Sequence, residues 1–407
     1  MKILLVSIRY WPEPFKSVDI AESLASLGHD VTVLCGLPNV CNNGIVCEDY
    51  KHGKNRCQEH NSVHILRVKE IGRRNNIFFR FLNYYSFTHY ANKMVKKLER
   101  DFDVVLVVEF SPIMMCIPGL KYAKKYDKKL IMYEMDLWPE SLLAGGIKNC
   151  SLIYNHYKKL SSKIYSECDK ILVSTKEHID YIKALPNCSG VDINYLPQYA
   201  DTIFEESNYE TIDNGIIDLM FAGNIGKAQS IDTIIRAAAL LKEDNKFKFH
   251  IIGSGSELDN IKKLAEELKA TNVVFYGQRK LEEMPNLYKT ADAMLVTLED
   301  KSYANMTVPG KVQSYMAAGK PIVGAINGSC CNFILNNGVG YCTSSGNYEE
   351  LAKLIKELDL QELKKIGEHS REIYFKKYNK DRFVDVLQNE LQNLLSDRNM
   401  DKTKNNN

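Results

Sequence analysis

The stretch FAGNIGKAQSIDTII, Phe221–Ile235, decides the fold that we expect, because it joins a strand pattern to a helix pattern through a glycine-containing turn. The strand pattern is the short, mainly apolar run Ile217–Ala222, and apolar residues then recur at helical spacing in Ser230–Leu241. Gly223 and Gly226 lie in the turn between them. A short apolar strand, a tight turn and an amphipathic helix in this order indicate a parallel, doubly wound α/β sheet.

The same alternation continues on both sides of this stretch. Short apolar runs without polar alternation are typical of parallel strands covered by helices on both faces, so we expect two doubly wound α/β domains in tandem. In the second half the further strands are expected at Lys248–Ile252, Val273–Tyr276, Ala293–Val296 and Pro321–Ala325, and the helices at Glu257–Leu268, Met284–Thr290 and Lys311–Ala318. In the first half the strands are expected at Lys2–Ile8, Val31–Leu34, Val63–Val68, Val104–Val108, Leu130–Tyr133 and Ile171–Val173, and the helices at Ser17–Leu27, Tyr84–Arg100, Met115–Lys125 and Tyr154–Cys168.

A polar stretch without a sustained period separates the two series of strands. With 407 residues the chain is long enough for two domains of ordinary size. A helical segment longer than one more crossover requires follows the second series, and a charged, Asn-rich tail ends the sequence. We therefore expect an N-terminal domain at 1–196, a linker at 197–215, a C-terminal domain at 216–362, C-terminal helices at 363–396 that pack back toward the N-terminal domain, and a disordered tail at 397–407.

The composition is that of a globular protein, with 45% hydrophobic and 26% charged residues. The net charge of +2 is unevenly distributed, since 27 Lys and Arg stand against 20 Asp and Glu up to Gly190, whereas 26 stand against 31 after it. We expect the basic first half to meet an anionic surface. No apolar run approaches the roughly 20 residues that span a bilayer, and none forms a leader after Met1, so any membrane contact is expected to be peripheral.

The 11 cysteines are scattered and odd in number, which favours free thiols in a reducing cytoplasm over a disulfide framework. Cys41, Cys47 and Cys57 lie near His52 and His60, and both residue types bind zinc. Their spacings match no zinc pattern, however. Unpaired thiols in a long loop are the favoured interpretation, and no metal is expected.

Four strand-to-helix loops of the second half suit an anionic ligand, and in parallel sheets such loops share one edge. The first holds Gly223 and Gly226, where an anion site with free helix-start N–H groups and a plain tight turn both fit the pattern. The second, IIGSGSELDNI, holds Gly253 and Gly255, for which a structural turn is favoured. The third, VVFYGQRKLEEM, holds Gly277, and a flat base is expected there. The fourth, VPGKVQSYMAAGKPIVGA, holds Lys311 and Ser314. Together the loops predict a site for a diphosphate-bearing ligand at Gly223, Asn224, Gly226, Lys227, Gly253, Gly277, Gln278, Arg279, Lys311 and Ser314.

In the first half, the stretch YEMDLWPESLLAGGI, Tyr133–Ile147, gathers three carboxylates around a tryptophan directly after a strand. Aromatic rings cover the apolar faces of a sugar, and carboxylates accept its hydroxyl hydrogen bonds or a proton. An equally weighted alternative is a helix cap at Asp136 or Ser141 beside a packed tryptophan. The catalytic candidate is Asp136, with Glu134 and Glu140 as substitutes, and the acceptor-side candidates are Trp138 and Trp11.

The segment Ile71–Arg100 interleaves basic and aromatic side chains over a helical pattern. This combination favours peripheral contact with an anionic membrane through the Arg73–Arg100 region. Nucleic acid would accept the same patch, but no RNA-binding signature accompanies it, so no nucleic-acid partner is expected. Part of the aromatic content is expected to lie in the core.

Taken together, FAGNIGKAQSIDTIIRAAALLK, IIGSGSE, VVFYGQRKLEEMPNLYKTADAMLVTL and VPGKVQSYMAAGKPIVGA resemble the donor domain of retaining glycosyltransferases of the GT-B fold, family 4. DLWPES and GHDVTVLCGLPN in the first half are similar to the branch of bacterial surface-polysaccharide enzymes that includes fucosamine transferases. The resemblance covers nearly the whole chain. It implies an α/β protein of GT-B architecture, with two Rossmann-like, doubly wound domains that face each other across a cleft.

The resemblance also implies an activity. Members of the family transfer a sugar from a nucleotide sugar with retained anomeric configuration, need no metal, and often act on lipid-linked acceptors at the cytoplasmic membrane face. Gly223 and Gly226 stand where the family's glycine loop meets the donor diphosphate, Gly277 where the base docks, and Lys311 where the branch keeps a lysine. We expect transfer from a UDP-sugar, with an N-acetylated deoxyhexosamine as the candidate sugar, to a lipid-linked saccharide in capsule, O-antigen or exopolysaccharide synthesis, without a cofactor.

The chain departs from the wider family at several positions. Met306 and Ser314 occupy the places of two glutamates, and Asn224 and Gln229 occupy those of an arginine and a lysine after the glycine turn. Phe15–Ser17 replaces the usual Gly-Gly loop of the first domain. Two other functions stay open. One is a nucleotide-sugar epimerase on the same scaffold. The other is a non-catalytic partner in polysaccharide assembly, and the absence of the two glutamates favours this second alternative.

Overall fold

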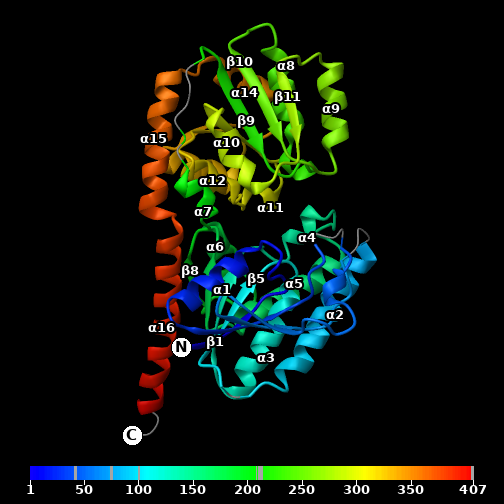
Figure 1. Ribbon diagram of the computed structural model, residues 1–407, viewed down its shortest axis with the longest axis vertical. Helices are drawn as coiled ribbons and strands as arrows, with labels where there is room; N and C mark the ends of the chain where they lie inside the picture. The colour runs from blue at the N-terminus through cyan, green and yellow to red at the C-terminus, as the bar shows by residue number, and fades with distance from the viewer. Residues whose placement is uncertain (41–43, 74–76, 100, 208, 210–213, 405–407) are drawn as a thin grey trace. The chain divides into compact units, whose positions relative to one another are not determined.

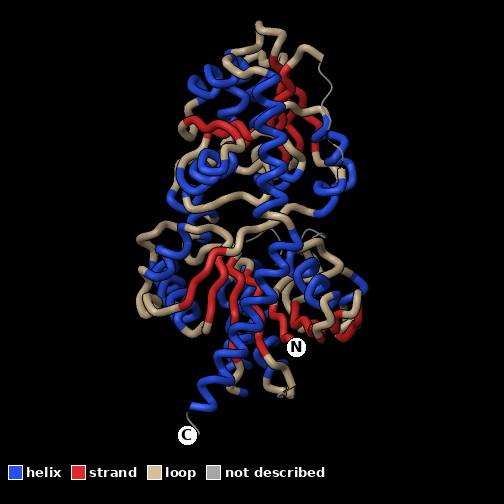
Figure 2. The backbone as a smooth tube through the Cα atoms, turned by 90° about the vertical axis from the view of Figure 1, so that its left-hand side faces the viewer, coloured by secondary structure: helices blue, strands red, loops and turns tan. Residues whose placement is uncertain are grey.

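The chain folds into two compact units in a computed structural model that describes residues 1–40, 44–73, 77–99, 101–207, 209 and 214–404 (Figure 1). The first unit comprises Met1–Leu196 and the residues from Val384 onward, and the second comprises Pro197–Phe383. Within each unit, helices cover both faces of one sheet, as Figure 2 shows by colour.

The described part of the first unit contains an eight-stranded sheet in the order β3-β4-β2-β1-β5-β6-β7-β8. Its neighbouring strands are parallel, except that β3 and β4 pair antiparallel. The sequence analysis missed β3, because its residues CQEH lack an apolar run, and it missed the short strand β8. The strands are β1 (Lys2–Val6), β2 (Asp30–Cys35), β3 (Cys57–His60), β4 (Val63–Arg67), β5 (Val104–Glu109), β6 (Lys129–Glu134), β7 (Lys170–Val173) and β8 (Asp192–Tyr195).

The central strands of this sheet are buried along nearly their whole length, because helices cover both faces. This burial explains their unbroken apolar sequences. The helices are α1 (Lys16–Ser26), α2 (Ile77–Val95), α3 (Ile117–Tyr126), α4 (Ser141–Ala144), α5 (Leu152–Ser166) and α6 (Glu177–Lys183), with 3₁₀ turns at Glu48–Tyr50 and Ile113–Cys116.

The second unit contains a six-stranded sheet in the order β11-β10-β9-β12-β13-β14, parallel throughout its described residues. The edge strand β14 had no counterpart in the sequence analysis. The strands are β9 (Ile217–Ala222), β10 (Phe247–Ile252), β11 (Val273–Gly277), β12 (Ala293–Thr297), β13 (Ile322–Ala325) and β14 (Gly340–Thr343). The helices are α7 (Thr202–Glu206), α8 (Ile231–Leu240), α9 (Leu258–Glu267), α10 (Met284–Lys289), α11 (Ser302–Asn305), α12 (Lys311–Ala317), α13 (Gly328–Asn337), α14 (Tyr348–Lys356) and α15 (Leu360–Lys377), with 3₁₀ turns at Lys227–Gln229 and Leu281–Glu283.

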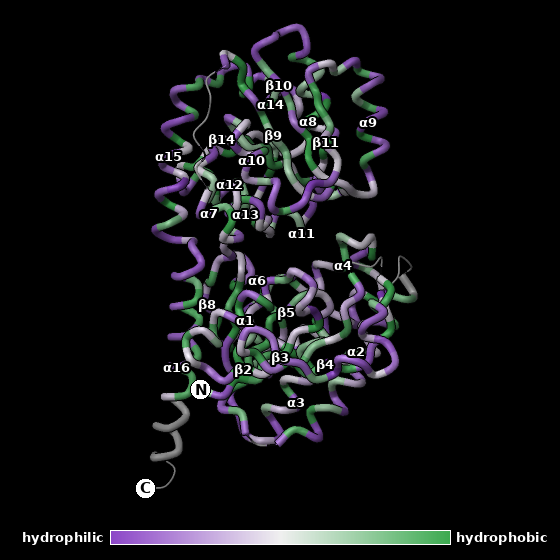
Figure 3. The backbone as a smooth tube through the Cα atoms, in the orientation of Figure 1, coloured by the Kyte–Doolittle hydropathy of each residue, from purple (hydrophilic) through white to green (hydrophobic). Residues whose placement is uncertain are grey.

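Two apolar cores lie on the two faces of the second sheet. One core joins the sheet to α8, α9 and α14, and the other joins it to α7, α10, α12, α13 and α15. Figure 3 shows the consequence, since the apolar residues gather on the strands while α9 and α15 carry many polar residues. The alternation of strands and helices seen in the sequence thus forms a doubly wound unit.

The C-terminal helices expected at 363–396 are two in the structure, and the first begins at Leu360. They are α15, which packs against α12 of the second unit, and α16 (Lys380–Lys404). The division occurs where the Asn379 side chain accepts a hydrogen bond from the Arg382 N–H, so that asparagine caps the start of a new helix. From Val384 onward α16 belongs to the first unit, where Leu391 is fully buried.

The linker and tail also differ from expectation. The short helix α7 lies within the expected linker at 197–215, because Phe204 is buried in a core of the second unit. Residues 208 and 210–213 of that linker are outside the described residues. In the tail expected to be disordered from 397, the backbone of α16 continues through Lys404, and 405–407 are outside the described residues.

Candidate functional site

The strand order of the second unit reverses between β9 and β12, and in open parallel sheets ligands bind at such a reversal, beyond the carboxyl ends of the strands. The β9–β12 ladder has only two registered pairs, and the last is Met220 with Met294. Beyond that pair, the end of β9 is bonded instead by Tyr315 of α12. Its hydroxyl donates to the Ala222 carbonyl at 3.0 Å and accepts from the Ala222 N–H at 3.1 Å. Sequence reasoning missed this tyrosine, which holds α12 against the end of β9.

The glycine loops after β9, β10 and β11 are joined by backbone hydrogen bonds. The Gly223 N–H donates to the Ile252 carbonyl at 3.0 Å, and the Gly253 N–H donates to the Gly277 carbonyl at 2.9 Å. Gly253 has φ of +141°, and a Cβ there would stand 1.8 Å from the Gly223 carbonyl oxygen. The structural interpretation of Gly253 therefore holds in the structure, since no larger residue fits between the two loops.

The expectation of free N–H groups in the first loop is wrong for Gly226. Its N–H donates to the Gln229 side-chain oxygen at 3.1 Å, and that oxygen also accepts from the Asn224 side-chain amide at 3.1 Å. Helix α8 begins only at Ile231, after a 3₁₀ turn. The Gln229 side chain thus accepts hydrogen bonds from the Gly226 N–H and the Asn224 amide, two groups that were expected to bind an anion.

Lys311 supplies a positive charge at this edge. Its Nζ lies 3.9 Å from the centre of the Phe221 ring and only 2.7 Å from where a Cβ on Gly223 would stand. Although the residue as a whole is half-buried, its ammonium group is enclosed, and this burial lowers the pKa to about 7, partly offset by Cys330. The structure therefore brings Lys311 to the first glycine loop, at the reversal of strand order.

The other expected donor residues lie in the loops after β9 and β11 and on α12. Asn224, Lys227, Gln278 and Arg279 are exposed, and the Gln278 side-chain oxygen accepts from the Ser254 hydroxyl at 3.2 Å. Arg279 lies 3.6 Å from the Glu283 carboxylate, a pair on the surface. Ser314 is half-buried one turn after Lys311. An aromatic-flanked lysine, an amide and two exposed cations offer positive charge and hydrogen-bond donors to a diphosphate ester.

Two of the three carboxylates expected in the first unit are structural. Glu134 is fully buried, and its carboxylate lies 2.9 Å from Nδ1 of His178. Glu140 is also buried and accepts hydrogen bonds from the hydroxyls of Tyr154 and Tyr181 at 2.6 and 2.7 Å. Both carboxylates are thus occupied by partners from distant parts of the chain.

Asp136 is the half-buried member of the three and lies just beyond β6. Its Oδ2 accepts a hydrogen bond from the Ser111 N–H at 2.9 Å, and its own N–H donates to Glu109 at 3.3 Å. It does not cap α4. Burial, followed by the charges of Asp136 and Glu134, raises the pKa of Glu109 well above its usual value. Sequence reasoning missed Glu109, since it ends an otherwise apolar strand.

The two tryptophans do not offer open rings to a sugar. Trp138 is only 2% exposed, its Nε1 donates to the Ser111 hydroxyl at 3.1 Å, and its ring packs edge-on against Tyr157. The acceptor-side expectation for Trp138 is therefore replaced by a packing role. Trp11 is half-buried and stacks on His60 at 4.1 Å between ring centres, so one of its faces is covered.

A buried polar network that the sequence analysis missed joins the loops after β1, β2 and β4. Arg9 and Glu70 form an ion pair at 3.0 Å with almost no exposure. Burial, partly offset by Arg9, raises the pKa of Glu70 to about 7. A Cβ on Gly36 would stand 2.2 Å from the Glu70 carboxylate, which explains the glycine in CGLPN.

The cysteine and histidine residues form no metal cluster in the part of the chain that the structure describes. Cys47 and Cys57 are free, and Cys41 lies outside the described residues. In the same described part, no helix is both long and apolar enough to cross a membrane.

Comparisons with known proteins relate the chain to glycosyltransferases. The family model "Glycosyl transferases group 1" matches residues 203–380. The chain is 27% identical over 300 residues to the probable glycosyltransferase WbjE of Pseudomonas aeruginosa, which covers 71% of this chain and 74% of that protein. It is 22% identical over 347 residues to the putative colanic acid biosynthesis glycosyl transferase WcaI of Escherichia coli (strain K12), or 78% of this chain and 82% of that protein.

Solved structures show the same fold. A crystal structure of HepE from Anabaena in complex with UDP and glucose has a TM-score of 0.68 to this chain, at 14% identity, and covers 96% of this chain and 99% of that one. The sheet orders and the structural match show that the chain has the GT-B fold, and its residues 203–380 match the model of the group 1 glycosyltransferases.

Proposed function

We propose that this glycosyltransferase moves a sugar from a UDP-sugar, with retained anomeric configuration, to a lipid-linked saccharide during synthesis of a surface polysaccharide. An N-acetylated deoxyhexosamine is the candidate sugar. One relative named for colanic acid biosynthesis supports a role in polysaccharide synthesis, and the UDP complex of a protein with the same fold supports a UDP-linked donor. No cofactor or metal takes part in the proposed reaction.

One observation carries the proposal. The Lys311 ammonium group lies beside Gly223 at the reversal of strand order, and the described part of the chain gives it no carboxylate partner. A buried cation without a counter-charge is costly, so a ligand that supplies negative charge there is favoured. The diphosphate of a nucleotide sugar has this charge.

In the proposed reaction, the bond between the anomeric carbon and the diphosphate oxygen breaks while the acceptor hydroxyl bonds to the same face of that carbon. Lys311, protonated in the complex, and the exposed Lys227 and Arg279 stabilise the charge that develops on the departing UDP. Asp136 orients the acceptor hydroxyl, whose proton passes to the departing phosphate or to this carboxylate. Glu134 and Glu140 keep their protein partners.

The acceptor is proposed to reach the enzyme at the inner face of the cell membrane. Tyr85 of α2 is 52% exposed, and Leu152 and Ile153 at the start of α5 are 88% and 44% exposed. These helices touch through Tyr85 and Tyr157, and the exposed Arg80, His89 and Lys93 lie on α2. Exposed apolar residues beside basic ones suit an anionic bilayer. Residues 74–76 and 100 of the expected Arg73–Arg100 region lie outside the described residues.

The function is tested by incubating the purified chain with UDP-, GDP- and dTDP-sugars and a membrane extract. We expect sugar transfer and UDP release with a UDP-sugar only when the extract is present. Lys311→Met should abolish transfer, whereas the matched variant Lys289→Met, at an exposed lysine of α10, should retain it. Absence of transfer and of nucleotide release with every donor would refute the proposal.

Membrane contact is tested separately with vesicles of neutral lipid and of neutral lipid containing phosphatidylglycerol. We expect co-sedimentation with the anionic vesicles, reduced several-fold by Leu152→Asp with Ile153→Asp. Leu335→Asp, at an apolar residue that is 53% exposed in the second unit, is the matched control. Equal sedimentation of the two variants would rule out the proposed surface.

A non-catalytic role in polysaccharide assembly is the second candidate, because Met306 and Ser314 replace the two glutamates of the wider family. In that case UDP-sugar would bind without turnover under any acceptor condition, and Lys311→Met would leave the cellular polysaccharide unchanged. An epimerase would instead alter the sugar of the donor without requiring an acceptor.

A further inference from the structure

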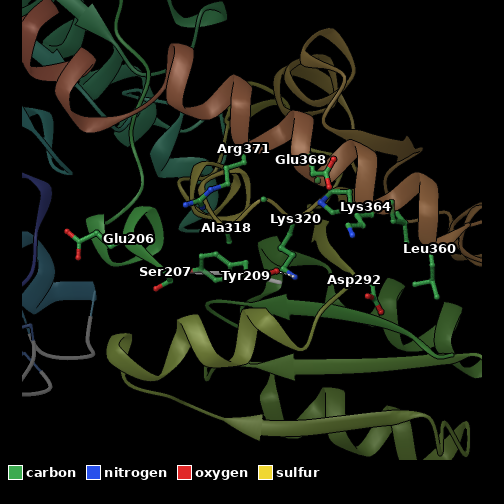
Figure 4. A pocket seen from close by; sticks show the side chains of 14 residues that line it. Glu206, Ser207, Tyr209, Asp292, Ala318, Lys320, Leu360, Lys364, Glu368 and Arg371 are labelled. Carbon is green, nitrogen blue, oxygen red and sulfur yellow. Dashed lines mark hydrogen bonds between the residues drawn. The ribbon is translucent and has the colours of Figure 1, made fainter. Parts of the chain in front are cut away.

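A pocket of about 670 Å³ lies in the second unit, away from the glycine loops. Asp292 stands directly before β12, and Lys320 and Pro321 stand directly before β13, so the pocket opens at the amino ends of these strands. Helix α15, Ser207 and Tyr209 form its other walls (Figure 4). Because the glycine loops and Lys311 lie at the carboxyl ends, this pocket is separate from the proposed donor site.

Lys320 is the feature of this pocket that needs an explanation. The residue is only 2% exposed, and its ammonium group, with three donors, has one hydrogen bond among the described residues, 3.4 Å to the Tyr209 carbonyl. Burial lowers its pKa to about 8, although the charge of Asp292 opposes this shift. Figure 4 shows the side chain between Tyr209 and Asp292. The pocket therefore holds a buried cation with unused donors.

Two further cations line the same pocket from α15. Arg371 is fixed in place, since its Nη1 donates to the Ala317 carbonyl and its Nη2 donates to the Glu205 carbonyl at 2.7 Å. Two of its five N–H donors are thus used. Lys364 is exposed, two turns before Arg371 on the same helix. Lys320, Lys364 and Arg371 thus line one cavity.

Three acidic residues also line the pocket, and the charge of Asp292 acts on Lys320. Asp292 already accepts the Asp218 N–H at 2.8 Å, and Glu206 and Glu368 are exposed. The cavity is also large enough for a small organic molecule, whose pockets usually measure about 300–1,000 Å³. A doubly charged phosphate matches the three cations better than a singly charged carboxylate does.

The close approach of α15 to the start of β13 is built into the backbone. A Cβ on Gly367 would stand 2.3 Å from the Gly319 carbonyl oxygen, so glycine is required for the helix to reach this point. Gly319 itself has φ of +64°, and a Cβ there would lie 3.5 Å from the Arg371 side chain. These two glycines hold Arg371 and Lys320 on the same cavity.

We propose that this pocket is a second ligand site, which binds the phosphate group of a small phosphorylated molecule through Lys320 and Arg371, with Lys364 at its mouth. The site does not depend on the proposed transfer reaction, because it uses none of the residues assigned to the donor. Its occupant stabilises the second unit by accepting hydrogen bonds from the unused donors of Lys320.

The experiment titrates the full chain with inorganic phosphate at constant ionic strength, followed by calorimetry and by the unfolding midpoint. We expect saturable binding to the wild type and to Lys311→Met, no binding to Lys320→Met, and several-fold weaker binding to Lys364→Ala. Lys353→Ala, at an exposed lysine of α14, is the matched control and should bind like the wild type. If Lys320→Met does not fold, the comparison of Lys364→Ala with Lys353→Ala decides.

The proposal is overturned if the wild type shows no saturable response to phosphate, or if every variant responds equally, which indicates a general salt effect. Loss of binding in Lys311→Met with retention in Lys320→Met would assign the phosphate to the donor site instead. A second arm uses glucose 6-phosphate in the same variants. Tighter binding than phosphate identifies a phosphate ester as the ligand, and weaker binding restricts the site to free phosphate.

Discussion

The ammonium group of Lys311 lies 3.9 Å from the centre of the Phe221 ring, and the two residues approach each other from α12 and β9, where the strand order reverses. An aromatic face attracts a cation, but by less than full hydration does. The pKa of Lys311 is therefore lowered to about 7. Protonation of this one residue links pH both to donor binding and to the stability of the second unit.

The affinity for UDP should depend on pH through Lys311. Above about pH 7 the free enzyme holds this lysine neutral, so binding of the diphosphate must also take up a proton, and the affinity falls by up to tenfold per pH unit. Calorimetric titration with UDP from pH 6 to pH 9 measures this slope. Lys311→Arg should bind with little pH dependence, whereas an unchanged slope in Lys311→Met would contradict the assignment.

The unliganded enzyme should become more stable when Lys311 is made apolar. The folded pKa of about 7 lies below the unfolded value near 10.5, so the unfolded chain binds more protons between these limits. The free energy of unfolding thus rises with pH in this window, and the full cost of burial applies below pH 7. Lys311→Met should raise the thermal unfolding midpoint at pH 6–7, by roughly 2–4 °C for each kcal/mol gained in the free energy of unfolding. The gain should be smaller near pH 10. Lys289→Met serves as the unaffected control.

Loss of the Tyr315 hydroxyl should loosen the end of β9. Tyr315→Phe leaves the buried N–H and carbonyl of Ala222 without their partner, at a cost of about 1–3 kcal/mol. Chemical denaturation measures this loss. We also expect weaker UDP binding, because Lys311 lies one turn before Tyr315 on the same helix. A Tyr315→Phe variant with wild-type stability would show that these bonds contribute nothing.

Removing the charge of Asp136 should lower kcat, whereas removing that of Glu140 should not. Asp136→Asn keeps the hydrogen bond from Ser111 but removes the charge, and it should lower kcat by roughly 10²–10⁴-fold with little change in the unfolding midpoint. Glu140→Gln still accepts the hydroxyls of Tyr154 and Tyr181, so its kcat should stay within a few-fold of wild type. The opposite ranking of the two kcat values would make Glu140 the acceptor-side carboxylate.

A methyl group at Gly253 should disrupt the joined glycine loops. Gly253→Ala would bring its Cβ to 1.8 Å from the Gly223 carbonyl oxygen, at a φ that alanine rarely adopts. We expect a lower unfolding midpoint and weaker UDP binding. Gly190→Ala is the matched control, since a Cβ there meets nothing within 4 Å. Equal behaviour of the two variants would show that the loops can separate at no cost.

The sequence predicted the fold well where the signal was local. The apolar runs of β1, β5 and β9 mark buried parallel strands, because each such strand must be apolar on both faces. The sequence did not predict β3, whose polar residues pair with β4 at the sheet edge, or the break before α16. Edge strands and helix ends depend on neighbours that a local pattern does not contain.

The candidate site was only partly predictable for the same reason. Glycine loops and a lysine before a short helix indicated the donor edge, but nothing near Gly226 in the sequence revealed that Gln229 takes its N–H. Trp138 looked suited to a sugar, yet Tyr157 and Ser111 enclose it. Burial of a side chain is decided by residues from other elements.

The sequence by itself determined two series of strands and helices, the position of the glycine turns and the presence of Lys311, because periodicity and turn chemistry act over a few residues. Only the tertiary structure decided that Lys311 lies against Phe221, that Glu134 pairs with His178, and that Lys320 is buried with donors to spare. These facts depend on contacts between residues far apart in the chain, where burial sets both the charge of a group and its availability to a ligand.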